Sequence, residues 1–405
     1  RSVWADEIGR WLPEHRIVVL PNEKTKRERV LSDIRSNLDY GPLVLVVHYE
    51  ALSIIAGKNR KTNRRVDIGS GWDKLGVWDL VIADEVHRIK ETKAQMSRAL
   101  KRVPATYKLG LSGSIIQNHA EELYSVLNWL FPKVYRSKWR DWNDRYLDYI
   151  EGGWGKICVG VKLDRVDEMR QELGVFMTYR RKEDELDLPP KTIETRFVDL
   201  SPGQLKAYRQ LQATCVATLD DGTKVKAAEG LAMLGRLRQV ATGLDLLGRT
   251  VQDSAKLDLA TEMVLDNPDE AFVIFTWYKA AGHAMAARLA GQGVGAALVD
   301  GDVPHEKRAE LIDRFQAGEF QVFIGTLATL AESVTLHRAN NAIFLDRDWN
   351  PARNVQAEDR IYRIGQSKNV TITHIVARGT VDELRVTPTL ANKEALRALI
   401  LGGTG

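Results

Sequence analysis

The feature that most constrains the fold is the stretch from residue 80 to residue 90, where an apolar run changes abruptly into polar residues. Leu80 to Ala83 has the composition of a strand buried on both faces of a parallel sheet. Asp84, Glu85 and His87 follow at once. Open α/β sheets bind their ligands at the carboxyl ends of the strands, so we expect these side chains beside a ligand.

Two adjacent carboxylates at such an edge suit phosphoryl-transfer chemistry. One of them can hold Mg²⁺ through water, and the other can orient and deprotonate the attacking water. An Asp-Glu pair by itself more often marks a strand that ends in a polar turn. The chemical interpretation therefore depends on the other motifs in the chain.

Length and composition set broad limits. The chain has 405 residues, which is too long for one typical domain, and two lobes are expected. Its net charge of +4 is too small to establish nucleic-acid binding. Two cysteines give no disulfide or metal pattern and favour a reducing compartment. No apolar run approaches the roughly 18 residues that span a bilayer, so no membrane partner is expected.

Short apolar runs alternate with helix-compatible segments in both halves of the chain, which predicts parallel βαβ units. The predicted strands are residues 17–20, 43–47, 80–83, 107–111, 272–275, 297–299, 322–324, 342–345 and 370–376.

The paired prolines at 189–190 stiffen an extended linker and mark the boundary between the halves. Residues 133–175 are rich in Trp, Arg, Asp and Gly without a clear period, which indicates an insertion. We predict an α/β fold of two tandem lobes with a cleft between them. The lobes span residues 1–190 and 191–405, and a helical insertion lies at about 133–175.

Polar residues follow other predicted strands too. His48 and Tyr49 follow the strand at 43–47, although their spacing alone favours an ordinary position at the rim of the core. Ser112, Gly113 and Ser114 follow the strand at 107–111. Small hydroxyl residues around a glycine let backbone amides approach a phosphate, but such turns are common.

A second chemical cluster lies at residues 356–366. Arg360 and Arg363 are three positions apart, so on a helix they would share a face. Their forked guanidinium groups match phosphate oxygens and could neutralise transition-state charge on a nucleotide held by the first lobe. The alternative is a surface helix on which Glu358 and Asp359 pair with the arginines.

Together these motifs resemble those of a known family. Residues 84–90, DEVHRIK, resemble the DEAH-type Walker B box of superfamily-two helicases. Residues 111–132 resemble motif III and its flanking helix in the Swi/Snf-type chromatin-remodelling ATPases, and residues 348–366 resemble motif VI of that family. Supporting matches are WADEIGRWLP at 4–13, DLPPK at 187–191 and FVIFTWY at 272–278.

The resemblance implies two RecA-like lobes and an ATP-dependent translocase that uses ATP and Mg²⁺ and binds double-stranded DNA. It implies that Asp84 coordinates Mg²⁺ through water, that Glu85 is the general base and that His87 links the nucleotide site to motif III. Arg360 and Arg363 would be arginine fingers. The implied nucleotide contacts are Gln356, Ser112, Gly113 and Ser114, and the implied DNA contacts are His48, Tyr49, Gly325, Thr326 and Trp349.

The chain departs from the family pattern in three places. No G-x-x-x-x-G-K-[ST] phosphate loop occurs, and the nearest segment is residues 56–59. Because the chain begins with Arg1 rather than Met, we expect that loop upstream. We also expect the 405-residue chain alone to hydrolyse ATP negligibly. Motif III has Ser-Gly-Ser-Ile in place of Thr-Gly-Thr-Pro, and Glu332 occupies the normally glycine-rich motif V.

Other functions stay open at this point. The chain could belong to a strand-separating DExH helicase or to the motor subunit of a restriction system. The missing phosphate loop also suggests a catalytically inactive DNA-binding scaffold. Short accessory insertions favour a bacterial, phage or DNA-repair-like member, so we expect the cytoplasm, or the nucleus in a eukaryote.

Overall fold

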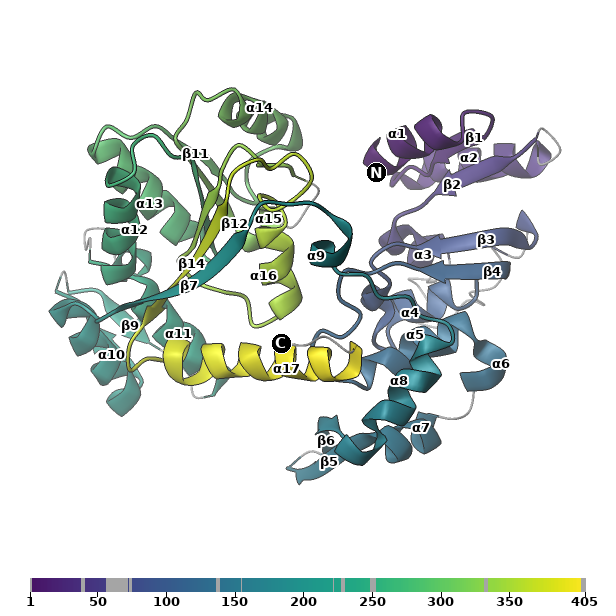
Figure 1. Cartoon of the computed structure of the whole chain (residues 1–405), viewed down its shortest axis with the longest axis horizontal. Helices are drawn as coiled ribbons and strands as arrows, with labels where there is room; N and C mark the ends of the chain where they lie inside the picture. Colours follow the sequence, from purple (N-terminus) through teal and green to yellow (C-terminus); the bar gives the residue numbers. More distant parts are fainter. Residues whose placement is uncertain are drawn as a thin grey trace. The chain divides into compact units, whose positions relative to one another are not determined.

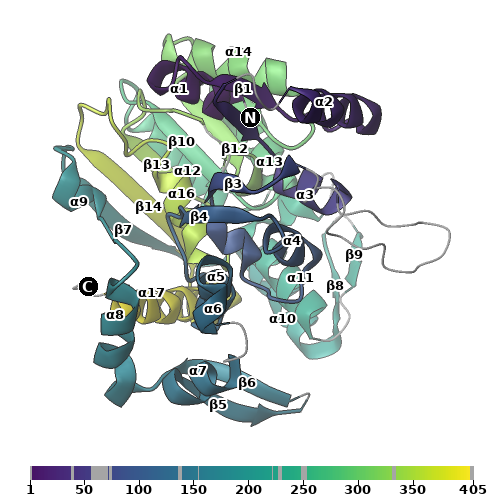
Figure 2. The ribbon, with the colours of Figure 1, turned by 90° about the vertical axis from the view of Figure 1, so that its right-hand side faces the viewer.

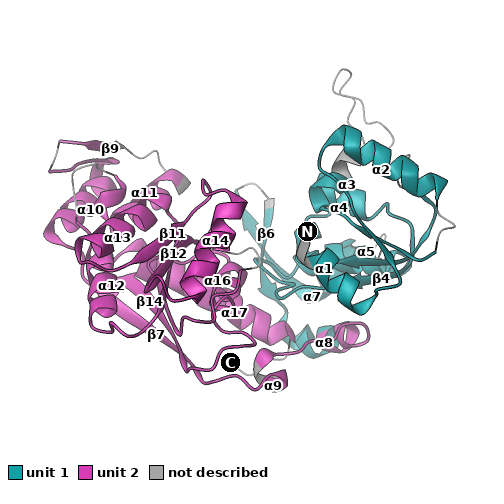
Figure 3. Ribbon diagram, turned by 90° about the horizontal axis from the view of Figure 1, so that it is seen from above, with its two compact units in different colours: residues 1–169 teal, residues 170–405 magenta. Residues whose placement is uncertain are grey.

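The computed structural model describes residues 2–37, 41–55, 72, 75–135, 139–153, 155–220, 222–226, 230–247, 253–330 and 334–401. The chain divides into two compact units, residues 1–169 and 170–405 (Figure 3). The domain limits of 1–190 and 191–405 stay a prediction.

The first unit contains two parallel strand pairs, β1 with β2 and β3 with β4. All four predicted strands are confirmed, and helices lie between them, as expected for βαβ units. The elements are α1 Ser2–Trp11, β1 Arg16–Val19, α2 Lys24–Ser36, β2 Leu43–Val46, α3 Tyr49–Ile55, β3 Trp78–Ala83, the 3₁₀ helix η3 Val86–Ile89, α4 Gln95–Leu100, β4 Ala105–Gly110, α5 Glu122–Leu130 and α6 Pro132–Tyr135.

The burial of β3 differs from the prediction. We expected both faces to be buried, but the side chains of Leu80 and Ile82 are 49% and 52% exposed. Val81 and Ala83 pack against the core of the first unit. Successive side chains of a strand point to opposite faces, so among the described residues one face of β3 is buried and the other is half-exposed.

The predicted helical insertion contains helices and, in addition, a β-hairpin that the sequence did not predict. The elements are α7 Trp139–Tyr146, β5 Leu147–Gly152, β6 Gly155–Val161, the 3₁₀ helix η4 Leu163–Arg165 and α8 Val166–Gly174. Strands β5 and β6 are antiparallel. The alternation of Ile157, Val159 and Val161 has the two-residue period of a strand. Figures 1 and 2 place this hairpin beyond α5 and α6 as seen from β3 and β4.

The second unit is built on a six-stranded sheet in the order β11-β12-β10-β13-β14-β7. All five neighbouring pairs are parallel, which confirms the predicted α/β architecture. The elements are α9 Lys182–Glu185, β7 Lys191–Val198, α10 Pro202–Thr214, β8 Val216–Thr218, β9 Lys224–Lys226, α11 Leu231–Thr242, the 3₁₀ helix η5 Leu244–Leu246, α12 Ala255–Leu265, β10 Phe272–Thr276, α13 Lys279–Gly291, β11 Ala296–Val299, α14 His305–Gln316, β12 Val322–Thr326, α15 Leu327–Leu330, β13 Asn341–Phe344, α16 Pro351–Glu358, β14 Val370–Ala377, the π-helical turn η6 Asp382–Val386 and α17 Thr387–Leu401.

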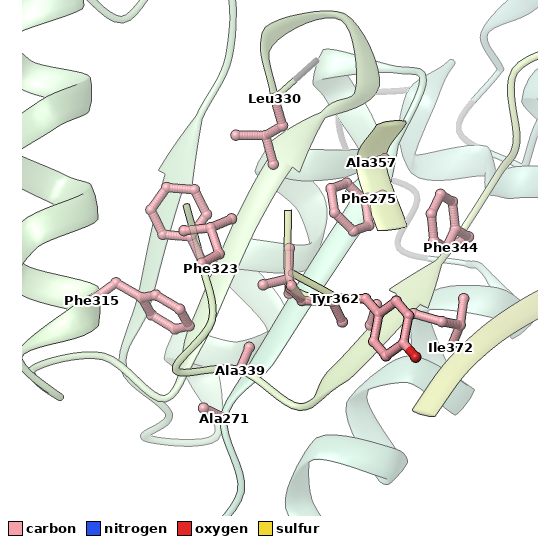
Figure 4. Close-up of a cluster of buried hydrophobic side chains, with 14 of the residues drawn as sticks. Ala271, Phe275, Phe315, Phe323, Leu330, Ala339, Phe344, Ala357, Tyr362 and Ile372 are labelled. Carbon is pink, nitrogen blue, oxygen red and sulfur yellow. The ribbon is translucent and has the colours of Figure 1, made fainter. Parts of the chain in front are cut away.

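Helices cover both faces of this sheet. Phe272 and Ile274 of β10 pack with residues of α12 and α13, and Phe275 packs on the opposite face with residues of α14 and α16. Figure 1 shows α12 and α13 on one side of the sheet and α16 on the other. On the α14–α16 face the rings of Phe275 and Phe344 stack 4.8 Å apart (Figure 4). A parallel sheet covered in this way leaves its strand ends for polar groups.

No helix in the described ranges combines the length and the apolar character that crossing a membrane requires.

Candidate active site

The two carboxylates lie in a tight turn between β3 and η3. Glu85 has φ 50° and ψ 51°, a left-handed backbone conformation that non-glycine residues seldom adopt. The loop after β4 fixes the chain on both sides of this turn. Leu111 N–H donates to Ala83 O at 2.9 Å, and Val86 N–H donates to Leu111 O at 2.8 Å. Strain of this kind, of order 1–3 kcal/mol, persists where surrounding contacts determine it and is frequent at active sites.

Each oxygen of the Asp84 carboxylate accepts a hydrogen bond. The indole N–H of Trp4 donates to Oδ2 at 3.0 Å, and the backbone N–H of Glu85 donates to Oδ1 at 3.0 Å. These donors orient the carboxylate that we expect to hold Mg²⁺. The contact from Trp4 was missed from the sequence because 80 positions separate the two residues.

His87 joins the general-base candidate to the loop after β4. Its Nδ1 lies 3.0 Å from Glu85 Oε2 and 2.9 Å from Ser112 Oγ. Within the loop, Ser114 N–H donates to Ser112 Oγ, and Ser114 Oγ–H donates to Ile116 O. A Cβ at Gly113 would meet nothing within 4 Å. The nucleotide contacts expected of Ser112, Gly113 and Ser114 stay predictions, and the hydroxyl of Ser114 is already used inside the loop.

A buried carboxylate that the sequence did not single out organises the next turn. Glu122 Oε2 accepts the backbone N–H groups of Gln117 and Asn118 at 2.9 and 3.2 Å. Its Oε1 lies 3.0 Å from Lys90 Nζ. Glu122 is the first residue of α5, and its carboxylate reaches back to the turn that precedes the helix.

The predicted DNA contacts at the start of α3 touch the carboxylate turn. The Tyr49 hydroxyl donates to Asp84 O at 2.8 Å, and the Arg88 guanidinium lies 5.0 Å from the centre of the Tyr49 ring. Burial raises the pKa of Tyr49 above its usual value of 10.0, so the hydroxyl remains a donor at working pH. Glu50 Oε1 accepts from Arg88 Nη2 at 2.5 Å, and His48 Nδ1 lies 3.8 Å from Glu50 Oε2. DNA binding by His48 and Tyr49 stays a prediction.

In the second unit the arginine pair lies beyond the end of α16, so the prediction that they share a helix face was wrong. The helix ends at Glu358. In a continuing helix, Arg360 O would accept from the N–H four residues later, but here it accepts from Leu336 N–H at 2.8 Å. Arg363 Nη1 donates to Thr335 Oγ1 at 2.8 Å. This long-range backbone pairing gives no local sequence signal.

The acidic residues beside the arginines lie against lysines. Lys182 Nζ lies 2.6 Å from Asp359 Oδ1, and Lys191 Nζ lies 3.4 Å from Glu358 Oε2. Lys191 also lies 5.1 Å from the centre of the Tyr362 ring. Burial raises the pKa of Glu358 above its usual range. We call these two ion pairs the lysine clamp.

Gln366 holds the loop that follows the arginines. Its Nε2 lies within hydrogen-bond distance of the backbone carbonyls of His337, Ala339 and Ile361, at 3.0, 2.8 and 3.2 Å. Its Oε1 accepts the backbone N–H groups of the next two residues at 3.0 and 2.9 Å. The side chain is 7% exposed. This glutamine therefore connects three backbone segments.

The remaining candidates of the second unit are half-buried or buried. A Cβ at Gly325 would lie 2.2 Å from Leu330 Cδ1, so packing requires the glycine. Thr326 Oγ1 lies 2.8 Å from Thr329 Oγ1. Trp349 stacks under the Arg238 guanidinium, 5.3 Å from the ring centre. Roles for these residues stay predictions, as does the nucleotide contact of Gln356, which is half-buried on α16. Glu332 lies outside the described residues.

The donor set at Asp84 fits Mg²⁺ bound through water. In the part of the chain that the structure describes, no group of three or more His, Cys, Asp or Glu residues could enclose a metal ion. Mg²⁺ usually keeps several waters and takes one or two carboxylates together with substrate phosphates. One oriented carboxylate at a strand end satisfies that requirement. Residues 56–59, which come nearest to a phosphate loop, lie outside the described residues.

Comparisons with known proteins show the family to which the chain belongs. The SNF2-related domain matches residues 1–246, and the Helicase conserved C-terminal domain matches residues 255–365. A Bacillus subtilis protein provisionally named ATP-dependent helicase/translocase YwqA is 28% identical over 424 residues, which cover 98% of this chain and 44% of that protein. The human SWI/SNF-related matrix-associated actin-dependent regulator of chromatin subfamily A member 1 is 27% identical over 407 residues, 94% of this chain and 36% of that protein.

Among solved structures, the Sulfolobus solfataricus SWI2/SNF2 ATPase core in complex with dsDNA has a TM-score of 0.42 at 21% identity, with 99% of this chain and 80% of that chain covered. This chain spans less than half the length of the two curated relatives named above. The SNF2-related domain match alone includes more than half of the residues. The chain belongs to the SNF2-related family, the Swi/Snf-type branch of the superfamily-two helicase ATPases.

Proposed function

We propose that the protein carrying this chain is a motor that couples ATP hydrolysis to movement along double-stranded DNA without separating the strands. The observation that carries the proposal is the turn after β3, where Glu85 is held in a left-handed conformation beside the oriented carboxylate of Asp84. The names of the relatives, a helicase/translocase and a chromatin regulator, support the same activity.

In this proposal Asp84 holds Mg²⁺ through water, and Glu85 accepts the proton of the attacking water at a carboxylate oxygen. His87 Nδ1 lies 3.0 Å from one oxygen of that carboxylate. Bound Mg²⁺ and ATP supply the phosphate charge and the reacting bond. Arg360 and Arg363 come from the second lobe and neutralise phosphate charge. Such groups contribute about 10³–10⁵ in rate, or about 4–7 kcal/mol.

The proposed lobes are residues 1–190, which bind the nucleotide, and residues 191–405, which supply the arginines. DNA is contacted along its phosphates, so binding does not depend on base sequence. His48 and Tyr49 of the first lobe and Gly325, Thr326 and Trp349 of the second lobe are the proposed contacts.

The replacement Glu85→Gln tests the chemical role in the full gene product. We expect hydrolysis to fall at least about 100-fold because the amide cannot accept the proton, while ATP binding is retained. The measurement is ATP turnover with saturating duplex, together with equilibrium ATP binding. Glu151→Gln in strand β5 is the matched control and should keep the parent rate. A variant at Glu85 with unchanged turnover would remove this residue from its role.

Comparing DNA substrates separates the motor from the other functions. Duplex should stimulate hydrolysis more than single strands do, and a triplex-forming third strand should be displaced while a partial duplex stays paired. Unwinding of the partial duplex would instead indicate a strand-separating helicase. Duplex binding without any hydrolysis by the full gene product would indicate an inactive scaffold.

A further inference from the structure

Three contacts join residues 48–50 to the carboxylate turn, although at least 35 positions separate the two segments. The Tyr49 hydroxyl donates to Asp84 O at 2.8 Å. The Arg88 guanidinium stacks over the Tyr49 ring at 5.0 Å, and Arg88 Nη2 donates to Glu50 Oε1 at 2.5 Å. The turn is therefore held by this segment both before and after Glu85.

The oxygen that accepts from Tyr49 belongs to the peptide plane between Asp84 and Glu85. Rotation of that plane changes φ of Glu85, which is 50°. The N–H of the same plane donates to Asp84 Oδ1 at 3.0 Å, so both polar ends of the plane are fixed. A left-handed conformation is unfavourable for a non-glycine residue by an amount similar to one hydrogen bond. The bond from Tyr49 is thus large enough to influence how often Glu85 adopts this conformation.

The same segment exposes groups that a DNA phosphate would meet. The side chains of His48 and Arg88 are each 41% exposed, and both lie near the carboxylate of Glu50. A phosphate bound there would accept from both His48 and Arg88, and so tie residue 48 to the helix that follows the carboxylate turn. Ordering this segment also orders Tyr49, which lies between His48 and Glu50.

We propose that Tyr49 is a positioning residue that transmits duplex binding at residues 48–50 to the general base, through the peptide plane between Asp84 and Glu85. This inference rests on the proposed function and extends it. It adds a route to Glu85 that is separate from the contact between His87 and Ser112. The route acts on the backbone of the base rather than on its carboxylate.

The replacement Tyr49→Phe tests the route because it removes the hydroxyl and keeps the ring. In the full gene product we expect the ratio of duplex-stimulated to basal hydrolysis to fall about tenfold, the equivalent of one hydrogen bond. Because Tyr49 is itself a proposed DNA contact, both rates are compared at saturating duplex, so that weaker binding does not lower the ratio. Tyr107→Phe in β4, whose side chain is 69% exposed, is the matched control. An unchanged ratio, or an equal fall in both rates, would overturn the inference.

Hydrogen–deuterium exchange gives a readout that does not depend on hydrolysis. Duplex should slow exchange of the backbone amides of residues 85–89 in the parent and in Tyr107→Phe, but not in Tyr49→Phe. Duplex binding that leaves these amides unchanged in the parent would refute the route even if hydrolysis is stimulated. Absence of hydrolysis in every form would contradict the proposed function alone. If Tyr49→Phe does not fold, Glu50→Gln should lower the stimulation ratio in the same direction, and an unchanged ratio would again refute the route.

Discussion

At the scale of the single residue, the backbone of Glu85 is as informative as its carboxylate. A side chain in the left-handed region at the end of a strand points in a direction that a regular turn would not give it. Its neighbours hold that direction through Asp84, His87 and the loop after β4. In the proposed function, residues that donate to Asp84 would therefore affect the chemistry without touching a nucleotide.

Trp4 provides a direct test at this scale. Trp4→Phe removes the N–H that donates to Asp84 Oδ2. Loss of a partner that orients a metal-binding carboxylate commonly weakens metal affinity by tenfold or more. We expect the Mg²⁺ concentration for half-maximal hydrolysis to rise about tenfold, with little change in the rate at saturating Mg²⁺.

The control for Trp4 is Trp11→Phe on the same helix, because the Trp11 side chain is 80% exposed. Titration of Mg²⁺ at fixed ATP and duplex measures both variants. Equal Mg²⁺ dependence in the two variants would contradict a role for the indole N–H.

At the scale of the element, the lysine clamp connects α9 and the start of β7 to the end of α16. Lys182 and Lys191 flank the paired prolines, and their partners directly precede the arginines. The clamp thereby fixes where the chain leaves α16. Arg360 follows two residues after the end of this helix.

Exchanging the charges of one pair tests the clamp. Lys182→Asp places like charges together at Asp359 and should lower stability by about 1 kcal/mol, because the pair is partly exposed. It should also lower the hydrolysis rate several-fold if the clamp positions the arginines. The double variant Lys182→Asp with Asp359→Lys should restore both quantities in a double-mutant cycle.

The exposed pair Lys206 with Asp220 is the matched control for that cycle, since its two atoms lie 2.9 Å apart. Reversing it should leave hydrolysis unchanged. A double variant at 182 and 359 that stays as impaired as the single variant would argue against the clamp.

Elements that depend on local pattern were predictable from the sequence, and those that depend on distant pairing were not. The core strands of the second unit read as apolar runs because both of their faces are covered. Strand β7 was missed, since its residues are half-buried or exposed and it is recognised only by pairing with β14. Asp84, Glu85 and His87 stand out by adjacency. Their partners do not stand out, because Trp4 and Tyr49 contact Asp84 from at least 35 positions away. The clamp lysines likewise contact the residues before the arginines from as far as 177 positions away.

At the scale of the whole molecule, the two units differ in how their sheets are covered. Among the described residues, the first unit has the parallel pairs β1–β2 and β3–β4, with a half-exposed face on β3, and the antiparallel pair β5–β6. The main sheet of the second unit has six strands between helices. Stability of the second unit therefore depends strongly on groups buried inside it. His374 on β14 is one of them, with its side chain 8% exposed.

Acid should destabilise the second unit through His374. Burial, together with the charge of Arg347, lowers the pKa of this imidazole from 6.5 to about 3. Between about pH 6.5 and pH 3 the unfolded chain binds a proton that the folded chain does not bind. Stability contributed by the neutral ring is complete above pH 6.5 and is lost as the pH falls. The loss at pH 5 is about 2 kcal/mol.

Urea unfolding at pH 7 and pH 5 measures this loss. His374→Gln should reduce the difference between the two pH values by about 2 kcal/mol, whereas His305→Gln on the surface of α14 should not. The same pH dependence in the parent and both variants would contradict the assignment.

Gln366 has a consequence for how signature motifs are interpreted. Its amide lies within hydrogen-bond distance of five backbone groups in three segments of the chain, and aspartate or glutamate lacks the donor that this requires. A residue of a family motif can thus have a structural role in holding a bend of the backbone, rather than a role in binding a ligand. Replacing such a residue would lower the stability of the fold first, and would change catalysis only as a consequence.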